Sequence, residues 1–265
     1  MNRRTIAAYG IGGAALGTAW AAGLSLASSR GDSTLEVIGS KKAQFALLNT
    51  RRFRALFVIG SPDSELQENI SRLTGMFRPR LDLVVGSRSG IDAIGTTFAE
   101  SHQVARTIAL DDPFGASDPG ADFASIPSDL KAKLPQGLEL GIHTIATGGW
   151  DRRRTERRSW FVEIRCGEIV CCMGPSLEDI ATYGPIGPPL ALAPTGDLQF
   201  SARRLGGSVI AINADETNEG DFDPMADGPP IRLTRIHPRD TAVFSLSAEG
   251  LGIPSWTEDR GILPS

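Results

Sequence analysis

The chain opens with an uncharged stretch of small and apolar residues, from residue 5 to residue 29, directly after Arg3 and Arg4. A helix of about 20 apolar residues is long enough to cross the hydrocarbon core of a bilayer. Positive charge on the N-terminal side keeps that end in the cytoplasm, so the domain that begins near Gly31 should lie outside. Residues 1–30 are therefore predicted to be an N-terminal signal or anchor helix.

The arginine pair followed by Thr5 and Ile6 resembles a twin-arginine export signal, in which two arginines precede a moderately apolar, Gly/Ala-rich stretch. Small residues at Ser25, Ala27 and Ser28 permit cleavage, whereas the length of the stretch permits a retained anchor. We expect the protein at the extracytoplasmic side of the cell membrane or exported. The alternative is an N-terminal helix buried in the globular domain.

Short apolar or β-branched runs predict three successive strands at residues 35–38, 45–49 and 55–59, joined by tight turns. Leu66, Ile70 and Leu73 then recur at helical spacing, after a start signal at Ser61 and Pro62. The next expected elements are a buried strand at 83–85 that ends at Gly86, a loop at 87–90, and a helix from about residue 92 to residue 104.

The second half of the chain repeats this order. Strands are predicted at 138–144, 159–164, 169–173, 190–193 and 209–213, a helix at 176–183, and a closing hairpin made of 231–235 and 242–246. Turn-rich or acidic loops are expected at 111–122 and 215–227. Strands followed by strand–helix alternation, in two halves, predict a layered α/β sandwich.

Composition supports one large domain, because residues 31–265 can bury a full core. With 31 acidic and 27 basic residues the net charge is −4, so any nucleic-acid contact would have to be local.

Cys166, Cys171 and Cys172 lie too close together for a disulfide framework across the chain. We expect buried thiols, with the adjacent pair on opposite faces of a strand; a bridge from Cys166 to either neighbour is the alternative.

The order of elements and several local phrases resemble the metallo-β-lactamase fold, most closely the extracellular C-terminal domain of the competence (ComEC-type) DNA-uptake proteins. The resemblance covers residues 35–253 and implies a four-layer αβ/βα sandwich over residues 31–265. In that family a strand–loop–helix with the pattern T-H-x-H-x-D-H-x-G holds one or two zinc or manganese ions. The matching segment here, residues 83–95, reads LVVGSRSGIDAIG.

Most ligand positions of that pattern are replaced. Arg88, Gly90 and Ala93 stand where the three histidines would be, whereas Asp92 and Gly95 match the pattern. Two later ligand-bearing motifs of the family are replaced as well. Residues 173–175 read MGP where the family has T-G-D, and residues 194–196 read PTG where it has H-H-G.

A catalytic zinc needs at least three imidazole, thiolate or carboxylate ligands and an open position for water. Arginine is a permanent cation, and glycine, alanine and proline have no donor side chain. His102, His143 and His237 have no metal-like spacing and are expected to be structural or at the surface. The sequence therefore predicts no metal site, no cofactor and no catalytic residue.

A polar group is expected at the mouth of the family's pocket, where it would bind a carboxylate or phosphate ligand. Its members are Ser87, Arg88, Ser89, Asp92 and Thr195. The alternative is a salt bridge between Arg88 and Asp92 that fills the vacated metal site.

A second candidate is a run that holds five arginines within residues 152–158, between two expected strands. Arginine with interleaved tryptophan can bind a nucleic-acid backbone or anionic lipid headgroups. The residues of this surface are Trp150, Arg152, Arg153, Arg154, Arg157 and Arg158. The alternative is a solvated connector.

These features predict a pseudoenzyme: a non-catalytic, exported or membrane-tethered domain that acts as a binding or scaffolding module at the cell envelope. Expected partners are the membrane, through an uncleaved N-terminal helix, and an envelope protein or nucleic acid; the sequence does not indicate an oligomeric state. One alternative is a hydrolase, nuclease or phosphodiesterase-like, that uses Ser87 or Ser89 without the usual metals, although no histidine is placed to serve as its base. Another is a purely structural envelope protein.

Overall fold

The computed structural model describes residues 33–60, 66–74, 80–101, 103–110, 129–134, 137–150, 156–186, 188–198, 204–214, 231–247, 250–252 and 255–257. The predicted signal or anchor segment lies outside these ranges, as do the predicted loops at 111–122 and 215–227. Within the described ranges, no helix is long and apolar enough to cross a membrane.

Three consecutive antiparallel strands begin the described chain, as the sequence predicts. They are β1 (Ser33–Gly39), β2 (Ala43–Asn49) and β3 (Arg54–Gly60). The side chains of β2 are buried from Ala43 to Leu48 rather than on alternate positions. Both faces of this sheet are covered, and a strand buried on both faces is a continuous apolar run.

Further strands extend this first sheet on both sides. β15 (Thr241–Ser247) pairs with β1, and it also pairs with β16 (Gly250–Leu251) and β17 (Ser255–Thr257). On the other side, β5 (Leu83–Ser87) and β7 (Thr107–Leu110) add in parallel to β3, which gives the order β16-β15-β1-β2-β3-β5-β7. Two short strands, β4 (Arg80–Leu81) and β6 (Gln103–Val104), pair separately.

The second sheet has the order β14-β13-β12-β11-β10-β9-β8. Its antiparallel part is made of β8 (Asp129–Lys133), β9 (Leu138–Trp150), β10 (Glu156–Cys166) and β11 (Ile169–Met173). Its parallel part continues from β11 through β12 (Leu190–Leu192), β13 (Val209–Asn213) and β14 (Arg232–Ile236).

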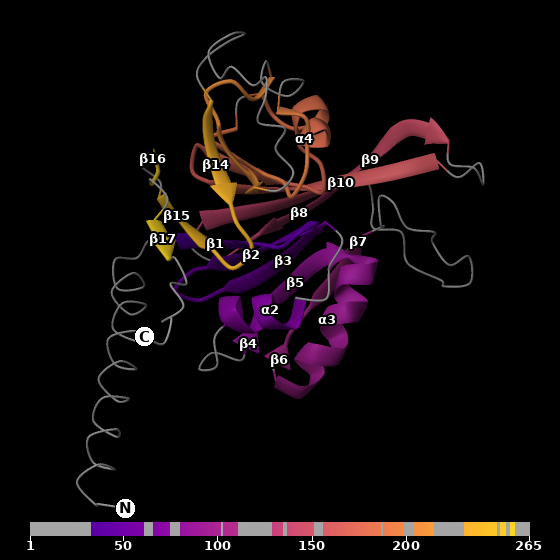
Figure 1. The fold of residues 1–265 in the computed structure, drawn as a ribbon, viewed down its shortest axis with the longest axis vertical. Helices are drawn as coiled ribbons and strands as arrows, with labels where there is room; N and C mark the ends of the chain where they lie inside the picture. The colour runs from indigo at the N-terminus through magenta and orange to yellow at the C-terminus, as the bar shows by residue number, and fades with distance from the viewer. Residues whose placement is uncertain are drawn as a thin grey trace, which may run out of the picture.

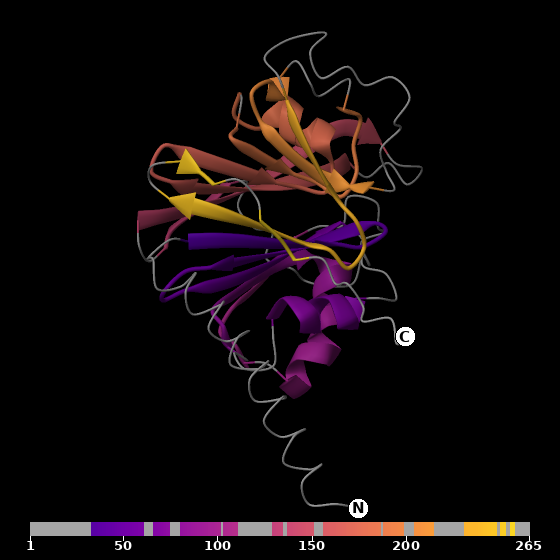
Figure 2. The same ribbon diagram turned by 60° about the vertical axis from the view of Figure 1, so that its left-hand side comes forward.

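Helices cover the outer faces of both sheets, so the molecule has four layers (Figures 1 and 2). Helices α2 (Leu66–Thr74) and α3 (Arg88–Ser101) pack on the first sheet, where Ile70, Leu73 and Ile94 meet the strands. Helix α4 (Leu177–Tyr183) packs on the second sheet through Leu177 and Ile180. This is the layered sandwich that the sequence predicts.

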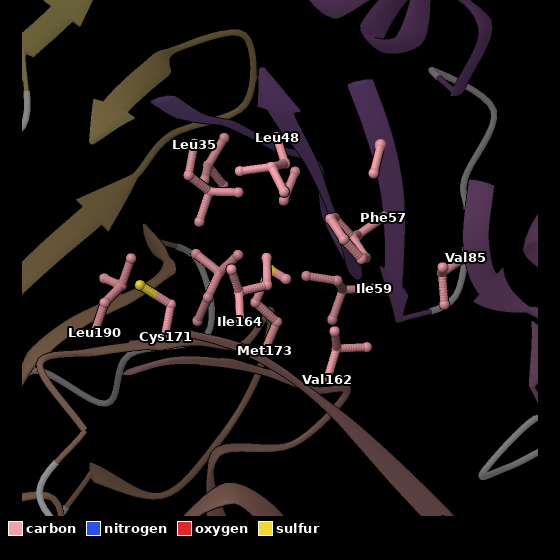
Figure 3. Close-up of a cluster of buried hydrophobic side chains, with 14 of the residues drawn as sticks. Leu35, Leu48, Phe57, Ile59, Val85, Val162, Ile164, Cys171, Met173 and Leu190 are labelled. Atoms are coloured by element: carbon pink, nitrogen blue, oxygen red, sulfur yellow. The ribbon is translucent and has the colours of Figure 1, made fainter. Parts of the chain in front are cut away.

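The main core lies between the two sheets. Leu35, Leu48, Phe57, Ile59 and Val85 of the first sheet point towards the second, whose labelled side chains point back at them (Figure 3). Those are Val162, Ile164, Cys171, Met173 and Leu190. Cys171 lies in this core, whereas Cys172 lies in the separate core under α4. The prediction of buried cysteines on opposite faces is confirmed for Cys171 and Cys172, whereas Cys166 is half-buried; all three thiols are free, so the alternative bridge does not form.

The predicted closing hairpin is wrong. β14 is the edge strand of the second sheet, parallel to β13, whereas β15 pairs with β1 in the first sheet. The chain crosses between the sheets at residues 237–240, where Pro238 forms a bridge with Gly39. Two short strands that are close in sequence are typical of a hairpin, but here each strand forms its backbone hydrogen bonds with a strand of a different sheet.

The predicted loop at residues 87–90 is also wrong, because α3 begins at Arg88 directly after β5. The Ser87 hydroxyl accepts a hydrogen bond from the N–H of Gly90, which starts the helix without a loop. The helix ends at Ser101, and the last predicted helical residues, Gln103 and Val104, form β6 instead.

Candidate binding site at the strand ends

The carboxyl ends of strands from both sheets meet at one edge of the sandwich. Gly60 ends β3, and a Cβ built on it would lie 2.9 Å from Cγ of Pro194, which follows β12. Ser87 ends β5 and donates a 3.4 Å hydrogen bond to the carbonyl oxygen of Gly60. The ends of β3, β5 and β12 are therefore neighbours, and two of them, those of β5 and β12, belong to segments that the resemblance assigns to the family's site.

Ser87, a candidate ligand-binding residue and one of the two candidate nucleophiles of the hydrolase alternative, is 2% exposed. Besides donating to Gly60, its hydroxyl accepts from Gly90 N at 3.3 Å and lies 3.4 Å from Ser89 Oγ. An activated serine needs a base within hydrogen-bond reach. None of these partners is a base, so the contacts of Ser87 are those of a helix cap.

The other candidates from this segment lie on the first turns of α3. Arg88 is half-buried, whereas Ser89 and Asp92 are exposed. Arg88 and Asp92 stand four residues apart, which places them on one helix face. Their pairing, and the binding of a ligand by this face, stay predictions.

The two later motifs, residues 173–175 and 194–196, lie side by side. Ser176 and Thr195 form an isolated β-bridge, and the Thr195 hydroxyl donates to the carbonyl oxygen of Pro175 at 3.2 Å. Gly174 is confined, since a Cβ on it would lie 3.1 Å from the carbonyl oxygen of Trp160. Thr195 therefore holds together the segments that follow β11 and β12.

At the same edge, side-chain amides form hydrogen bonds between the two sheets. Asn213, at the end of β13 and 2% exposed, donates to the carbonyl oxygens of Ser40 and Ala43. Gln44 of β2 is fully buried and donates to the carbonyl oxygen of Ala211 at 3.5 Å. These bonds fix the first sheet against the second beside the strand ends.

Sequence reasoning missed a polar cluster at the start of α4. Ser159 donates to Oδ2 of Asp179 at 2.5 Å, and the backbone N–H of Asp179 donates to Ser176 Oγ. Burial raises the pKa of the Asp179 carboxyl, and the neighbouring Glu178 adds to the rise, while hydroxyl hydrogen bonds oppose it. The spacing Ser-x-x-Asp at 176–179 is a helix-capping signal, so sequence could indicate the cap but not Ser159.

The residues at the strand ends do not fit the metal ions of the resembled family. The resemblance assigns metal ligands to the positions of Arg88, Gly90, Ala93, Pro175 and Pro194, and these residues offer no donor suited to zinc or manganese. Within the described ranges, no group of three or more His, Cys, Asp or Glu side chains is arranged to hold a metal ion.

The two histidines within the described residues lie in different segments of the second half of the chain. His143 of β9 stacks on Phe161 with ring centroids 4.5 Å apart, and its Nε2 lies 3.6 Å from Oε2 of Glu163. His237 is exposed in the crossing between β14 and β15. His102 lies outside the described residues.

The second candidate surface belongs to the β9–β10 hairpin. β8 pairs with β9 no further than His143, and β11 pairs with β10 no further than Val162. Beyond these residues β9 and β10 pair with each other and form a two-stranded ribbon that projects from the sandwich (Figure 1). The backbones of Trp150, Arg157 and Arg158 are in the ribbon, whereas Arg152, Arg153 and Arg154 lie outside the described residues.

No protein-family model matches the chain, and no curated protein matches it either. Among solved structures, it is similar to the metallo-beta-lactamase fold protein YhfI from Bacillus subtilis, with a TM-score of 0.50 and 10% sequence identity. The match covers 81% of this chain and 100% of the YhfI chain. At this identity the likeness shows the fold alone, so the predicted fold class is confirmed and the closer resemblance to competence proteins stays a prediction.

Proposed function

From the metallo-β-lactamase fold as the premise, we propose that this chain is a non-catalytic binding or scaffolding module held at the cell envelope. The observation that carries the proposal is the donor set at the strand ends. At the positions that the resemblance assigns to metal ligands, the chain carries Arg88, Gly90, Ala93, Pro175 and Pro194. Without ligands, the fold cannot activate a metal-bound water in the family's way.

Two contacts support this reading over a metal-free hydrolase. Gly60 and Pro194 pack against each other, which leaves no space between them for a substrate group. Ser87 is buried and serves as a helix cap.

The binding role is assigned to the β9–β10 ribbon together with the first turns of α3, which carry half-buried Arg88 and exposed Asp92. Residues 144–160 hold five arginines and two acidic residues, a net charge of +3 in a chain whose total is −4. A partner with an anionic surface, an envelope protein or a nucleic acid, is complementary to this ribbon, and a two-stranded ribbon is narrow enough for a nucleic-acid groove. A retained N-terminal helix would hold the module at the membrane.

The catalytic part of the proposal is tested on the full chain purified in detergent, loaded with zinc or manganese and then dialysed. We expect substoichiometric metal by elemental analysis and no hydrolysis of bis(p-nitrophenyl) phosphate above the buffer rate. Stoichiometric metal, or hydrolysis that Asp92→Ala abolishes, would restore the hydrolase alternative.

The binding part is tested by fluorescence anisotropy with a labelled DNA duplex, at several salt concentrations. Replacing Arg152, Arg153 and Arg154 by alanine should weaken binding and lower its salt dependence, because each lost phosphate contact removes about one unit of the salt slope. Lys131→Ala/Lys133→Ala, on the exposed positions of β8, is the matched control. Equal effects of both variants would remove the ribbon from the binding site, and no binding at all would direct the search to a protein partner.

A further inference from the structure

The strand that follows the predicted anchor places one particular end of the sandwich next to the membrane. The uncharged stretch ends at residue 29 and β1 begins at Ser33, so Arg30, Gly31 and Asp32 are all that separate them. A fully extended chain covers at most about 3.5 Å per residue, which limits this connection to about 14 Å. The start of β1 therefore cannot lie far from the bilayer surface if the anchor is retained.

Strand register shows which other segments share that end. Thr34 pairs with Asn49, and Asn49 pairs with Arg54, so the β2–β3 turn lies there. The parallel strands β5 and β7 also begin at this end, because Ala55 pairs with Leu83 and Val84 pairs with Thr107. The turn and the starts of β3, β5 and β7 form what we call the tether-side edge, residues 50–54, 80–83 and 105–107.

Basic side chains dominate the tether-side edge. Arg51, Arg52, Arg80 and Arg106 are all exposed. Its one acidic side chain, Asp82, is engaged, as it accepts a hydrogen bond from Arg54 N and lies 3.5 Å from Nε of Arg80.

Arg54 makes this edge rigid. Its guanidinium donates to Asn49 Oδ1 at 2.9 Å, to the carbonyl oxygen of Arg80 at 3.3 Å and to that of Thr74 at 3.2 Å. These bonds tie β2, β3, β4 and the end of α2 together beneath the exposed arginines. The corresponding end of the second sheet differs, since it carries both signs of charge: Lys133, Glu139, Glu168 and Arg232.

We infer that the tether-side edge of the first sheet is a membrane-contacting surface, whose exposed arginines bind the phosphate headgroups of anionic lipids. The inference rests on the proposed retention of the N-terminal anchor. Charge alone does not choose this edge, because Lys41 and Lys42 are exposed at the opposite end. The distance from the tether distinguishes the two ends. Six residues of β1 put the β1–β2 turn about 20 Å farther from the tether, which is beyond a Debye length of about 8–10 Å.

This orientation has a consequence for the strand ends. Gly60, Ser87 and Lys42 lie at the opposite end of the same strands, so Arg88 and Asp92 face away from the bilayer. The membrane then holds one edge of the module, and the edge that carries the candidate ligand-binding residues stays accessible to a partner.

The test compares two probe positions in the full chain, reconstituted in lipid vesicles. A fluorophore is attached to Arg52→Cys or to Lys42→Cys in a Cys166→Ser background, since Cys171 and Cys172 are buried. The vesicles contain a nitroxide headgroup lipid as quencher, in phosphatidylcholine with or without about 30% phosphatidylglycerol. The Lys42 site is the matched control, because the two turns flank the same strand, β2.

We expect the probe at position 52 to be quenched about threefold or more over that at position 42 in anionic vesicles, with the contrast reduced at about 0.5 M salt. Adding Arg51→Glu and Arg106→Glu should reduce it as well. Equal quenching, or stronger quenching at position 42, would overturn the inference while leaving the anchor intact. A chain that does not float with the vesicles would overturn the anchor and the inference together.

Discussion

Pro194, which follows β12 in the second sheet, lies against Gly60, the last residue of β3 in the first. A Cβ built on Gly60 would be 2.9 Å from Cγ of Pro194 and 2.4 Å from the carbonyl oxygen of Lys42. Gly60 also has a φ of +87°, a conformation that residues with a Cβ avoid. One glycine therefore allows both the turn of the chain and the close approach of the two sheets.

Gly60→Ala should lower the free energy of unfolding by about 2–4 kcal/mol, because it adds a steric clash to the left-handed strain. The measurement is urea unfolding of the full chain in detergent, followed by tryptophan fluorescence. Gly137→Ala is the matched control, since Gly137 has a φ of +75° with nothing within 4 Å of its added Cβ. The control should lose about 1–2 kcal/mol; an equal loss in both variants would mean that the sheets are not in close contact at Gly60.

Asn213→Ala should destabilise the protein by about 2–3 kcal/mol, because it removes the buried amide that donates to the carbonyl oxygen of Ser40 and to that of Ala43, although the latter keeps the backbone N–H of Ser40. Asn49→Ala is the comparison at the half-buried end of β2. It removes hydrogen bonds to Glu36 and Arg54, but water can reach both of these partners, so the loss should be smaller, about 1 kcal/mol. The same unfolding assay compares the two variants. Similar losses would contradict the role of Asn213 as a link between the sheets.

Asp179 gives a pH-dependent prediction with a definite sign. Burial raises the pKa of its carboxyl in the folded state, so folding opposes ionisation, and stability falls as the pH rises from the unfolded pKa through the folded one. Asp179→Asn removes this penalty, so its unfolding free energy should improve relative to the wild type between pH 4 and pH 7, from about the unfolded carboxyl pKa upward.

Ser159→Ala provides the complementary variant, because the Ser159 hydroxyl donates to the Asp179 carboxyl and lowers its pKa. Without that donor the ionised carboxylate is less stable, so the loss of stability should be greater at neutral pH than in acid. Chemical unfolding at a series of pH values measures both variants. The same pH trend in the two variants would show that the carboxyl is not buried against Ser159.

The thiols should differ in reactivity. Burial raises the pKa of Cys171 to about 12 and raises that of Cys172 as well, whereas Cys166 is half-buried at the end of β10. Because the thiolate is the reactive form, iodoacetamide should modify Cys166 first. Because one tryptic peptide, residues 166–203, holds all three cysteines, the modified site is assigned by tandem mass spectrometry of that peptide, before and after denaturation. Modification of Cys172 in the native protein at a rate similar to that of Cys166 would contradict its place under α4.

The local pattern of apolar and charged residues was sufficient to predict most of the strands. The runs around Leu35, Phe45 and Ala55 are short, apolar and separated by charged turns, and each forms a strand. Polar edge strands such as β8, with the sequence DLKAK, were not predicted. Such a strand has little apolar periodicity of its own, and its pairing with β9 stabilises it.

For the candidate site, the resemblance pointed to segments that the structure places at the ends of strands. Ser87, expected in a loop, is the last residue of β5, and Pro194 and Thr195 follow β12. The role of Ser87 as a helix cap could not be predicted, because it depends on α3 beginning without a loop. Ser159 and Asp179 are twenty positions apart, and no local pattern in the sequence indicates that they form a hydrogen bond.

The sequence by itself indicated most of the strands and helices and the placement of Cys171 and Cys172 on opposite faces of one strand, because these follow from side-chain type and local periodicity. The tertiary structure alone decided that β14 and β15 enter different sheets, that Gly60 meets Pro194, and that the arginines at the starts of three strands share one edge with the start of β1. Those relations depend on strand pairing between distant segments, which is chosen by the total backbone and core area that pairing buries.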